Sequence, residues 1–295
     1  MVERDHGRTR CSPGRWFPAR VERRMTGSIP ILMYHSVDRA SAPAFRSFVV
    51  SPERFDEQMA RLKAGGYQAV TVSDLARARR GGPPLPARPV VITFDDGFAD
   101  FHRHALPVLC RYGLTATLYL VTGEIGGTSR WLAREGEGDR PMLSWTQVRE
   151  VAAAGIECGA HSVSHPKLDA LPRRNAAIEV RWSKETLEDR LGRPCLTFAY
   201  PYGFYDAAVR RLVRQAGFAS ACAVRFCLSG PTDDLFGLRR LKIGPETTDN
   251  QLERLLALPA VAHLRTVAYW RSLVYRQVRR VVMPLVRRRT EKGNR

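Results

Sequence analysis

Short runs of apolar residues alternate with segments of helical periodicity from about residue 29 to residue 260 of this chain. The clearest run, Val90–Phe94, is apolar apart from one threonine, which is typical of a strand covered on both faces. Runs of this length, bounded by Gly, Pro and polar residues, predict strands. The other runs that we interpret as strands are 31–34, 115–121, 156–160, 196–200, 219–224 and 241–243.

Helix signals stand between these runs. Ser51 is a favourable N-cap before a proline, and Phe55, Met59 and Leu62 fall on one helical face, so a helix is predicted up to Gly65. Each further predicted helix is followed by glycine, the residue preferred just after a helix C-terminus. These helices are 144–154, 171–191 and 207–216.

Strands that alternate with helices indicate βα units and a parallel sheet. About seven such units fit between residues 29 and 260, which favours a closed or nearly closed α/β barrel over an open sheet. In such barrels the chemically active side chains follow the carboxyl ends of the strands. We therefore expect a leader (1–28), a barrel domain (29–260) and a C-terminal segment (261–295).

The formal net charge of +18 is concentrated at the two ends of the chain. Residues 1–28 hold seven arginines against three acids, and residues 264–295 hold ten lysines and arginines against one acid. Such ends could contact phosphates or anionic lipids, or they could be solvated tails. Because no nucleic-acid recognition motif accompanies them, we expect no nucleic-acid partner.

The six cysteines contain no CxxC pair, and four lie in apolar stretches. This pattern argues against a cysteine-rich zinc site and favours reduced, buried thiols. The leader lacks the apolar core of a secretory signal, and no run is long enough to span a bilayer, so we predict a cytoplasmic protein. Met25 is a candidate start, because the ordered pattern begins only at Ile29.

The C-terminal segment is amphipathic when wound as a helix from Val261 to Leu285. Its apolar side carries Trp270, and its other side is rich in arginine. A basic helix of this kind can lie on the inner face of an anionic membrane. Packing of the apolar side against the barrel is the alternative, and both stay open.

Two acids follow the clearest strand: Asp95 and Asp96, then Gly97. Adjacent strand residues point to opposite sides, so one carboxylate could bind a metal while the other accepts a proton. The alternative is an Asp-Asp-Gly turn that only closes the strand.

Two histidines, His161 and His165, follow another predicted strand. Histidines four residues apart share one face if the segment is helical, and with an aspartate they could bind a divalent ion with positions left for water. Two surface histidines are the alternative. A third string, 198–203, ends a further strand, where Pro201 and Gly203 favour a turn whose N–H groups could face a ligand.

The strings TFDDG, HSVSH and FAYPYG, in this order, resemble the polysaccharide deacetylase family, which has the NodB-homology domain. The resemblance covers roughly residues 29–245, includes ILMYHSV, MLSWTQV and LRRLKI, and is strongest to the branch that acts on poly-N-acetylglucosamine exopolysaccharides. It implies a distorted (β/α)7 barrel. It also implies a metal-dependent N-deacetylase whose partner is an N-acetylated oligosaccharide, polysaccharide or lipid-linked sugar.

By this resemblance, Asp95 is the general base, and Asp96, His161 and His165 hold the metal. The implied metal is zinc, with cobalt or nickel as alternatives. Tyr202, in the third motif, is expected to offer its backbone N–H to the oxyanion of the reaction.

Two positions depart from the family pattern. The arginine that many members carry in the third motif is Ala199 here, and we predict that Arg240 replaces it by pairing with Asp95; a surface cation is the alternative. The late histidine that serves as general acid is absent from 241–248, so His35 is our candidate acid, with a structural histidine as the alternative. These departures keep open an inactive carbohydrate-binding protein on the same scaffold.

Overall fold

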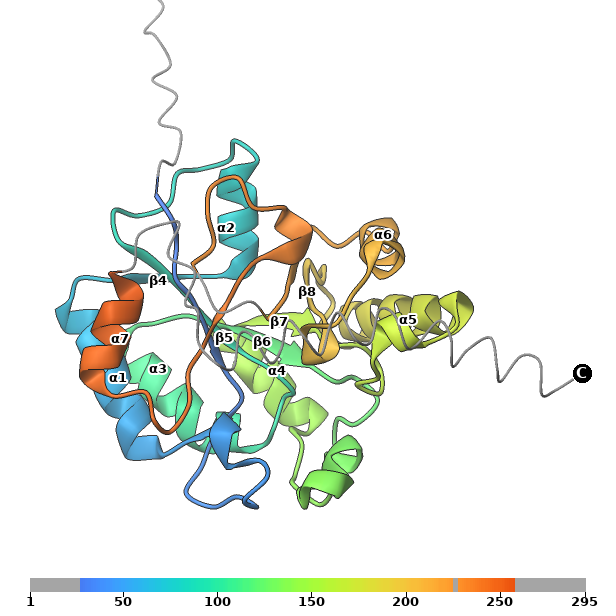
Figure 1. Cartoon of the computed structure of the whole chain (residues 1–295), viewed down its shortest axis with the longest axis horizontal. Coiled ribbons are helices and arrows are strands. Elements are labelled where there is room, and N and C mark those ends of the chain that lie inside the picture. Colours follow the sequence, from blue (N-terminus) through green and yellow to red (C-terminus); the bar gives the residue numbers. More distant parts are fainter. Residues whose placement is uncertain (1–26, 225–227, 258–295) are drawn as a thin grey trace, which may run out of the picture.

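The computed structural model describes residues 27–224 and 228–257. At its centre, seven parallel strands form one continuous curved sheet (Figure 1). In spatial order they are β10 (Leu241–Lys242), β1 (Ile31–Tyr34), β5 (Pro89–Phe94), β6 (Thr117–Leu120), β7 (Glu157–Ala160), β8 (Thr197–Ala199) and β9 (Ser220–Cys222). An eighth strand, β4 (Gln68–Val70), pairs with the first half of β5.

One short segment connects the two edges of the sheet. Leu238 forms a parallel bridge with Cys222 of β9, and Leu241 pairs with Leu32 of β1. The sheet therefore curves into a distorted, nearly closed barrel, as the alternation of strands and helices predicted.

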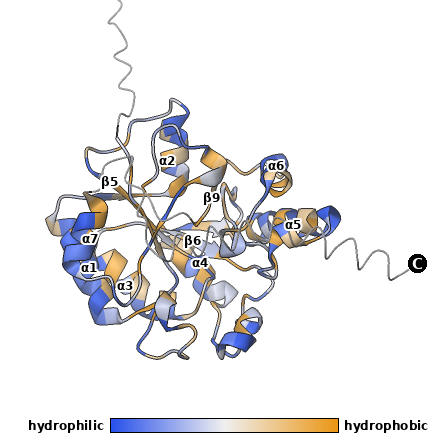
Figure 2. Ribbon diagram, viewed as in Figure 1, coloured by the Kyte–Doolittle hydropathy of each residue, from blue (hydrophilic) through white to orange (hydrophobic). Residues whose placement is uncertain are grey.

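Helices cover the outside of the barrel, with apolar strands at the centre and hydrophilic outer faces on α1 and α7 (Figure 2). The α-helices are α1 (Pro52–Ala64), α2 (Val72–Arg79), α3 (Leu106–Tyr112), α4 (Trp145–Ala153), α5 (Arg173–Leu191), α6 (Ala207–Gln215) and α7 (Asp249–Leu256). A π-helical turn, η2 (Phe101–Ala105), precedes α3, and a 3-10 helix, η3 (Arg130–Glu135), follows β6.

The predicted helices α1, α4, α5 and α6 are confirmed to within about two residues. At α1 the Ser51 hydroxyl accepts a hydrogen bond from the Arg54 N–H, and Phe55, Met59 and Leu62 are buried, as their spacing required. The sequence interpretation missed β4, α2 and α7, and also the two-residue strands β2 (Ser36–Val37) and β3 (Val49–Val50).

Alternate side chains of the strands enter two separate apolar clusters. Leu32 and Ile92 pack in the larger cluster between sheet and helices, whereas Ile31 and Val91 pack in a smaller one with Tyr119. This smaller cluster fills the barrel interior, because most of its members come from strands around the sheet. Because side chains alternate along a strand, this arrangement also determines which residues near the carboxyl end of each strand point into the barrel.

The predicted leader and C-terminal segment lie almost wholly outside the described residues, which begin at residue 27 and end at residue 257. The division of the chain at its ends, and the amphipathic helix with its membrane contact, therefore stay predictions. Among the helices in the described ranges, none is both long enough and apolar enough to cross a bilayer.

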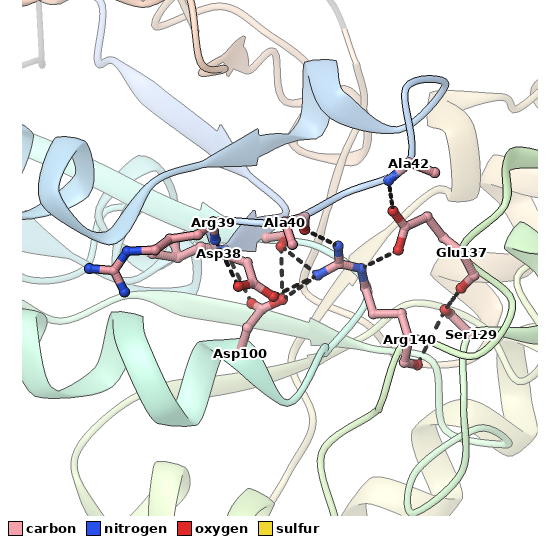
Figure 3. Close-up of polar contacts among 10 residues, drawn as sticks. Asp38, Arg39, Ala40, Ala42, Asp100, Ser129, Glu137 and Arg140 are labelled. Carbon is pink, nitrogen blue, oxygen red and sulfur yellow. Dashed lines mark hydrogen bonds and ion pairs between the residues drawn. The ribbon is translucent and has the colours of Figure 1, made fainter.

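A buried arginine joins three loops at the carboxyl end of the sheet (Figure 3). The Arg140 guanidinium lies 3.0 Å from Asp100 Oδ2 and 2.9 Å from Glu137 Oε2, and it donates to the Ala40 carbonyl at 3.0 Å. Asp100 also accepts a hydrogen bond from the Ser36 hydroxyl. The cluster fixes the loops after β1, β5 and β6 relative to one another.

Replacing Arg140 by alanine should destabilise the fold strongly, because the carboxylates of Asp100 and Glu137 would stay buried without their cation. Breaking a buried ion pair from one side typically costs about 3–5 kcal/mol. Urea unfolding measures this, with the exposed Arg149→Ala on α4 as control, expected within about 0.5 kcal/mol of wild type. Equal stabilities of the two variants would contradict the assigned role of the cluster.

Candidate functional site

The structure brings the predicted site residues to one end of the barrel. Asp95 and Asp96 follow β5, His161 follows β7, and His35 follows β1. Since the strands are parallel, their carboxyl ends meet at this end. Tyr202 follows β8, and Arg240 enters the barrel from the segment that closes it.

Asp95 and Arg240 form a buried bidentate ion pair. Arg240 Nη1 lies 2.6 Å from Asp95 Oδ1, and Nη2 lies 2.7 Å from Oδ2. Arg240 is fully buried, and its Nε donates to the Ala223 carbonyl. Burial alone would raise the pKa of Asp95, but the charge and hydrogen bonds of Arg240 outweigh it and hold this pKa below its usual value. The pairing expected from the sequence is present.

Asp96, His161 and His165 form a compact triangle of ligand atoms. The Nε2 atoms of His161 and His165 are 3.2 Å apart. Asp96 Oδ1 lies 3.5 Å from His161 Nε2 and 3.3 Å from His165 Nε2. Ligands held about 2.0 Å from a tetrahedral ion are about 3.3 Å apart, so one divalent ion fits this triangle. All three residues are buried.

The two histidines do not converge through helical spacing, so that part of the sequence interpretation was wrong. Residues 161–165 form a tight turn in which Ser162 (φ 66°) and His165 (φ 57°) adopt left-handed backbone conformations. The Ser162 hydroxyl accepts a hydrogen bond from the His165 N–H at 3.0 Å. A left-handed turn, rather than one helical face, directs both rings to Asp96.

Hydrogen bonds orient the ligands of the triangle. His161 Nδ1 lies 2.7 Å from the Ala199 carbonyl oxygen, so it carries the proton and leaves the Nε2 lone pair toward Asp96. Burial would raise the pKa of Asp96, but the two imidazole rings beside its carboxylate outweigh this effect and lower the pKa. Asp96 is therefore a carboxylate, and the donor set of two imidazoles and one carboxylate suits a divalent transition metal.

Tyr202 lies in the short 3-10 turn η5 (Pro201–Gly203) beside the triangle. Its backbone is left-handed (φ 57°), and its half-exposed ring stands 4.6 Å from the ring of His165, centre to centre. This turn therefore lies beside the candidate metal ligands.

His35 follows β1, the strand that pairs with β5, and its ring edge lies against Phe48 at 4.8 Å between ring centres. Its Nδ1 is buried and has no hydrogen-bond partner in the described part of the chain. Burial lowers the pKa of His35 to about 4, against the opposing charges of Asp96 and Asp95. His35 therefore stands ready to accept a proton rather than holding one at neutral pH.

Sequence reasoning missed the aromatic support of the site. Trp131 of η3 lies 5.0 Å from the ring of His165 and stacks on Phe98 at 6.3 Å, both between ring centres. A single tryptophan in a segment without periodicity gave no signal that it would reach the second histidine. The tryptophan in the MLSWTQV string is a different one, Trp145, which begins α4.

Comparison with known proteins gives concordant matches. Residues 82–221 match the family model described as polysaccharide deacetylase. YxkH of Bacillus subtilis, whose name carries a provisional assignment to the same family, is 25% identical over 217 residues, which span 74% of this chain and 72% of that protein.

A second relative is the poly-β-1,6-N-acetyl-D-glucosamine N-deacetylase of Escherichia coli K12. It is 34% identical over 140 residues, which are 46% of this chain but only 20% of that enzyme. Among solved structures, the Streptococcus pyogenes deacetylase PplD in complex with acetate superposes with a TM-score of 0.68 at 26% identity, covering 78% of this chain and 99% of PplD. The chain is therefore similar to polysaccharide deacetylases, by the family model over residues 82–221 and in fold over most of its length.

Proposed function

We propose that this protein is a metal-dependent N-deacetylase that hydrolyses the acetamide of an N-acetylated sugar. The observation that supports this most directly is the ligand triangle of Asp96, His161 and His165 beside an arginine-paired Asp95. An inactive carbohydrate-binding protein has no need of this set. The donor chemistry fits zinc, with cobalt and nickel as alternatives.

Each residue of the site has a distinct proposed role. Asp96, His161 and His165 hold the ion, which when bound supplies an electrophile that polarises the acetamide carbonyl and acidifies water. Asp95 accepts the proton of the attacking water, and Arg240 keeps Asp95 ionised. The Tyr202 N–H donates to the oxygen that becomes negative as water adds to the carbonyl carbon.

The reaction is completed by protonation of the leaving nitrogen. The C–N bond breaks as the nitrogen takes a proton, and the products are acetate and the protonated amine, so one water is consumed and no other reactant is needed. We assign delivery of this proton to His35, which follows the strand paired with β5 and so lies close to both carboxylates. His35 would take the proton that Asp95 accepts from water and pass it to the nitrogen.

For the substrate, we propose a polymer or oligomer of N-acetylglucosamine. The support is the name of the Escherichia coli relative, which acts on the β-1,6-linked polymer. A lipid-linked N-acetylated sugar is the alternative within the same chemistry.

The first prediction concerns the metal and the base. EDTA treatment should abolish acetate release from N-acetylglucosamine oligomers, and zinc should restore it. Asp95→Asn should lower kcat by about 10²–10⁴-fold while retaining zinc, because the base is lost but the ligands are intact. Asp56→Asn, which removes a carboxylate paired with Arg111 on the outer surface, serves as control. Acetate release that survives EDTA would contradict the proposal.

The second prediction concerns pH. In Arg240→Met, burial of Asp95 would no longer be opposed, so the pKa of Asp95 should rise. Because the base acts in its ionised form, the acidic limb of the kcat/KM profile should move to higher pH, by about 1–3 units. Arg210→Met, which breaks an outer pair with Asp234, should leave the limb in place. An unmoved limb in the Arg240 variant would show that Asp95 is not the titrating base.

The third prediction concerns His35. His35→Ala should lose about 10²–10⁴-fold in kcat while its zinc content stays at the wild-type level, since His35 is outside the ligand triangle. His102→Ala on the outer surface, where the imidazole pairs with Glu150, is the matched control. Full activity of His35→Ala would remove His35 from the mechanism.

A further inference from the structure

The turn that carries the second histidine ligand is tied to a helix by one carboxylate. Glu179 Oε2 of α5 accepts hydrogen bonds from the Val163 N–H at 2.8 Å and the Ser164 N–H at 2.9 Å. Its Oε1 accepts a third from the Ser164 hydroxyl at 2.6 Å. Two successive N–H groups of the His161–His165 turn thus converge on a single side chain.

This turn needs support, because its backbone is strained. Ser162 and His165 both have positive φ, which costs a non-glycine residue about 1–2 kcal/mol each. Such conformations persist only where the surroundings hold them. If the turn relaxed, His165 would move away from Asp96 and His161.

The support comes from two sides. On one side, the Gly123 N–H donates to the Val163 carbonyl at 2.9 Å, and a Cβ at Gly123 would lie 2.7 Å from that oxygen, so only glycine allows this approach. On the other side stands Glu179. In the described part of the chain no lysine or arginine forms an ion pair with it, so its polar contacts there are those to the turn.

We propose that Glu179 is a positioning residue for the metal site: through three hydrogen bonds it holds the left-handed turn that places His165 against Asp96. This inference rests on the proposed metal-dependent function. No hydrogen bond joins Glu179 to either ligand ring in the described residues, so it acts on metal affinity through the backbone of the turn. Loss of a group that orients metal ligands typically lowers metal affinity about 10–100-fold.

The test is zinc affinity of the full chain, freed of metal and titrated with zinc against a chelating indicator. Glu179→Ala should bind zinc about 10–100-fold more weakly than wild type. Glu179→Gln keeps an acceptor oxygen for the two N–H groups, so its zinc affinity should lie between those of Glu179→Ala and the wild type. Glu185→Ala is the matched control on the same helix, because it removes an exposed carboxylate that only pairs with Arg181. It should bind zinc as wild type does.

A second readout separates positioning from general loss of structure. The visible absorption of bound cobalt reports the ligand geometry, so it should change in Glu179→Ala, while thermal unfolding of the metal-free variant should stay close to that of metal-free Glu185→Ala. If Glu179→Ala does not fold, Ser164→Ala removes only the hydroxyl bond and should still weaken zinc binding a few-fold.

The outcomes are distinct. Wild-type zinc affinity in both Glu179→Ala and Ser164→Ala would overturn the role of Glu179 and leave the proposed function standing. Failure of wild-type protein to bind zinc, cobalt or nickel would overturn the proposed function and this inference together.

Discussion

A buried charge pair, Asp95 with Arg240, is the interaction on which the site and the closure of the barrel both depend. A carboxylate inside a barrel is costly unless a cation neutralises it and its oxygens are hydrogen bonded. Arg240 meets both needs from the segment 238–242, which is also the segment that joins β9 to β1. One contact therefore stabilises both Asp95, the proposed base, and the closing strand.

Backbone strain marks the same end of the barrel. In the described part of the chain, four non-glycine residues have positive φ, and all belong to the three motifs: Asp96, Ser162, His165 and Tyr202. Strand alternation points Asp95 inward with Val91, and it would point Asp96 outward. The left-handed conformation at Asp96 reverses that, so two adjacent carboxylates both reach the site.

The fold was predictable where one local signal sufficed. At α1, the serine N-cap, the proline and the apolar face all predicted the helix that is observed. The apolar run 90–94 likewise predicted strand β5. Strand β4 escaped prediction because only one of its three residues is buried, and helix α2 because its eight residues are too few to show a repeated apolar spacing. Element identity needs a repeated pattern, which such short elements lack.

The site was predictable in its residues but not in its geometry. Sequence spacing identified the histidines, yet it suggested a helical face where a strained turn exists, because left-handed backbone at serine and histidine has no compositional signal. The supports of that turn, Glu179 and Gly123, lie far from it in the sequence. Only the folded chain brings these supports together.

The departure at Ala199 shows how the barrel tolerates a change in a motif. The Ala199 carbonyl, a backbone group that any side chain would leave in place, fixes the tautomer of His161. The guanidinium beside Asp95 comes from Arg240, in the segment that closes the barrel. Since the parallel strands converge at one end, a charge needed there can come from several strands. What the chemistry constrains is the position of the guanidinium beside Asp95, and the strand that supplies it is free to differ.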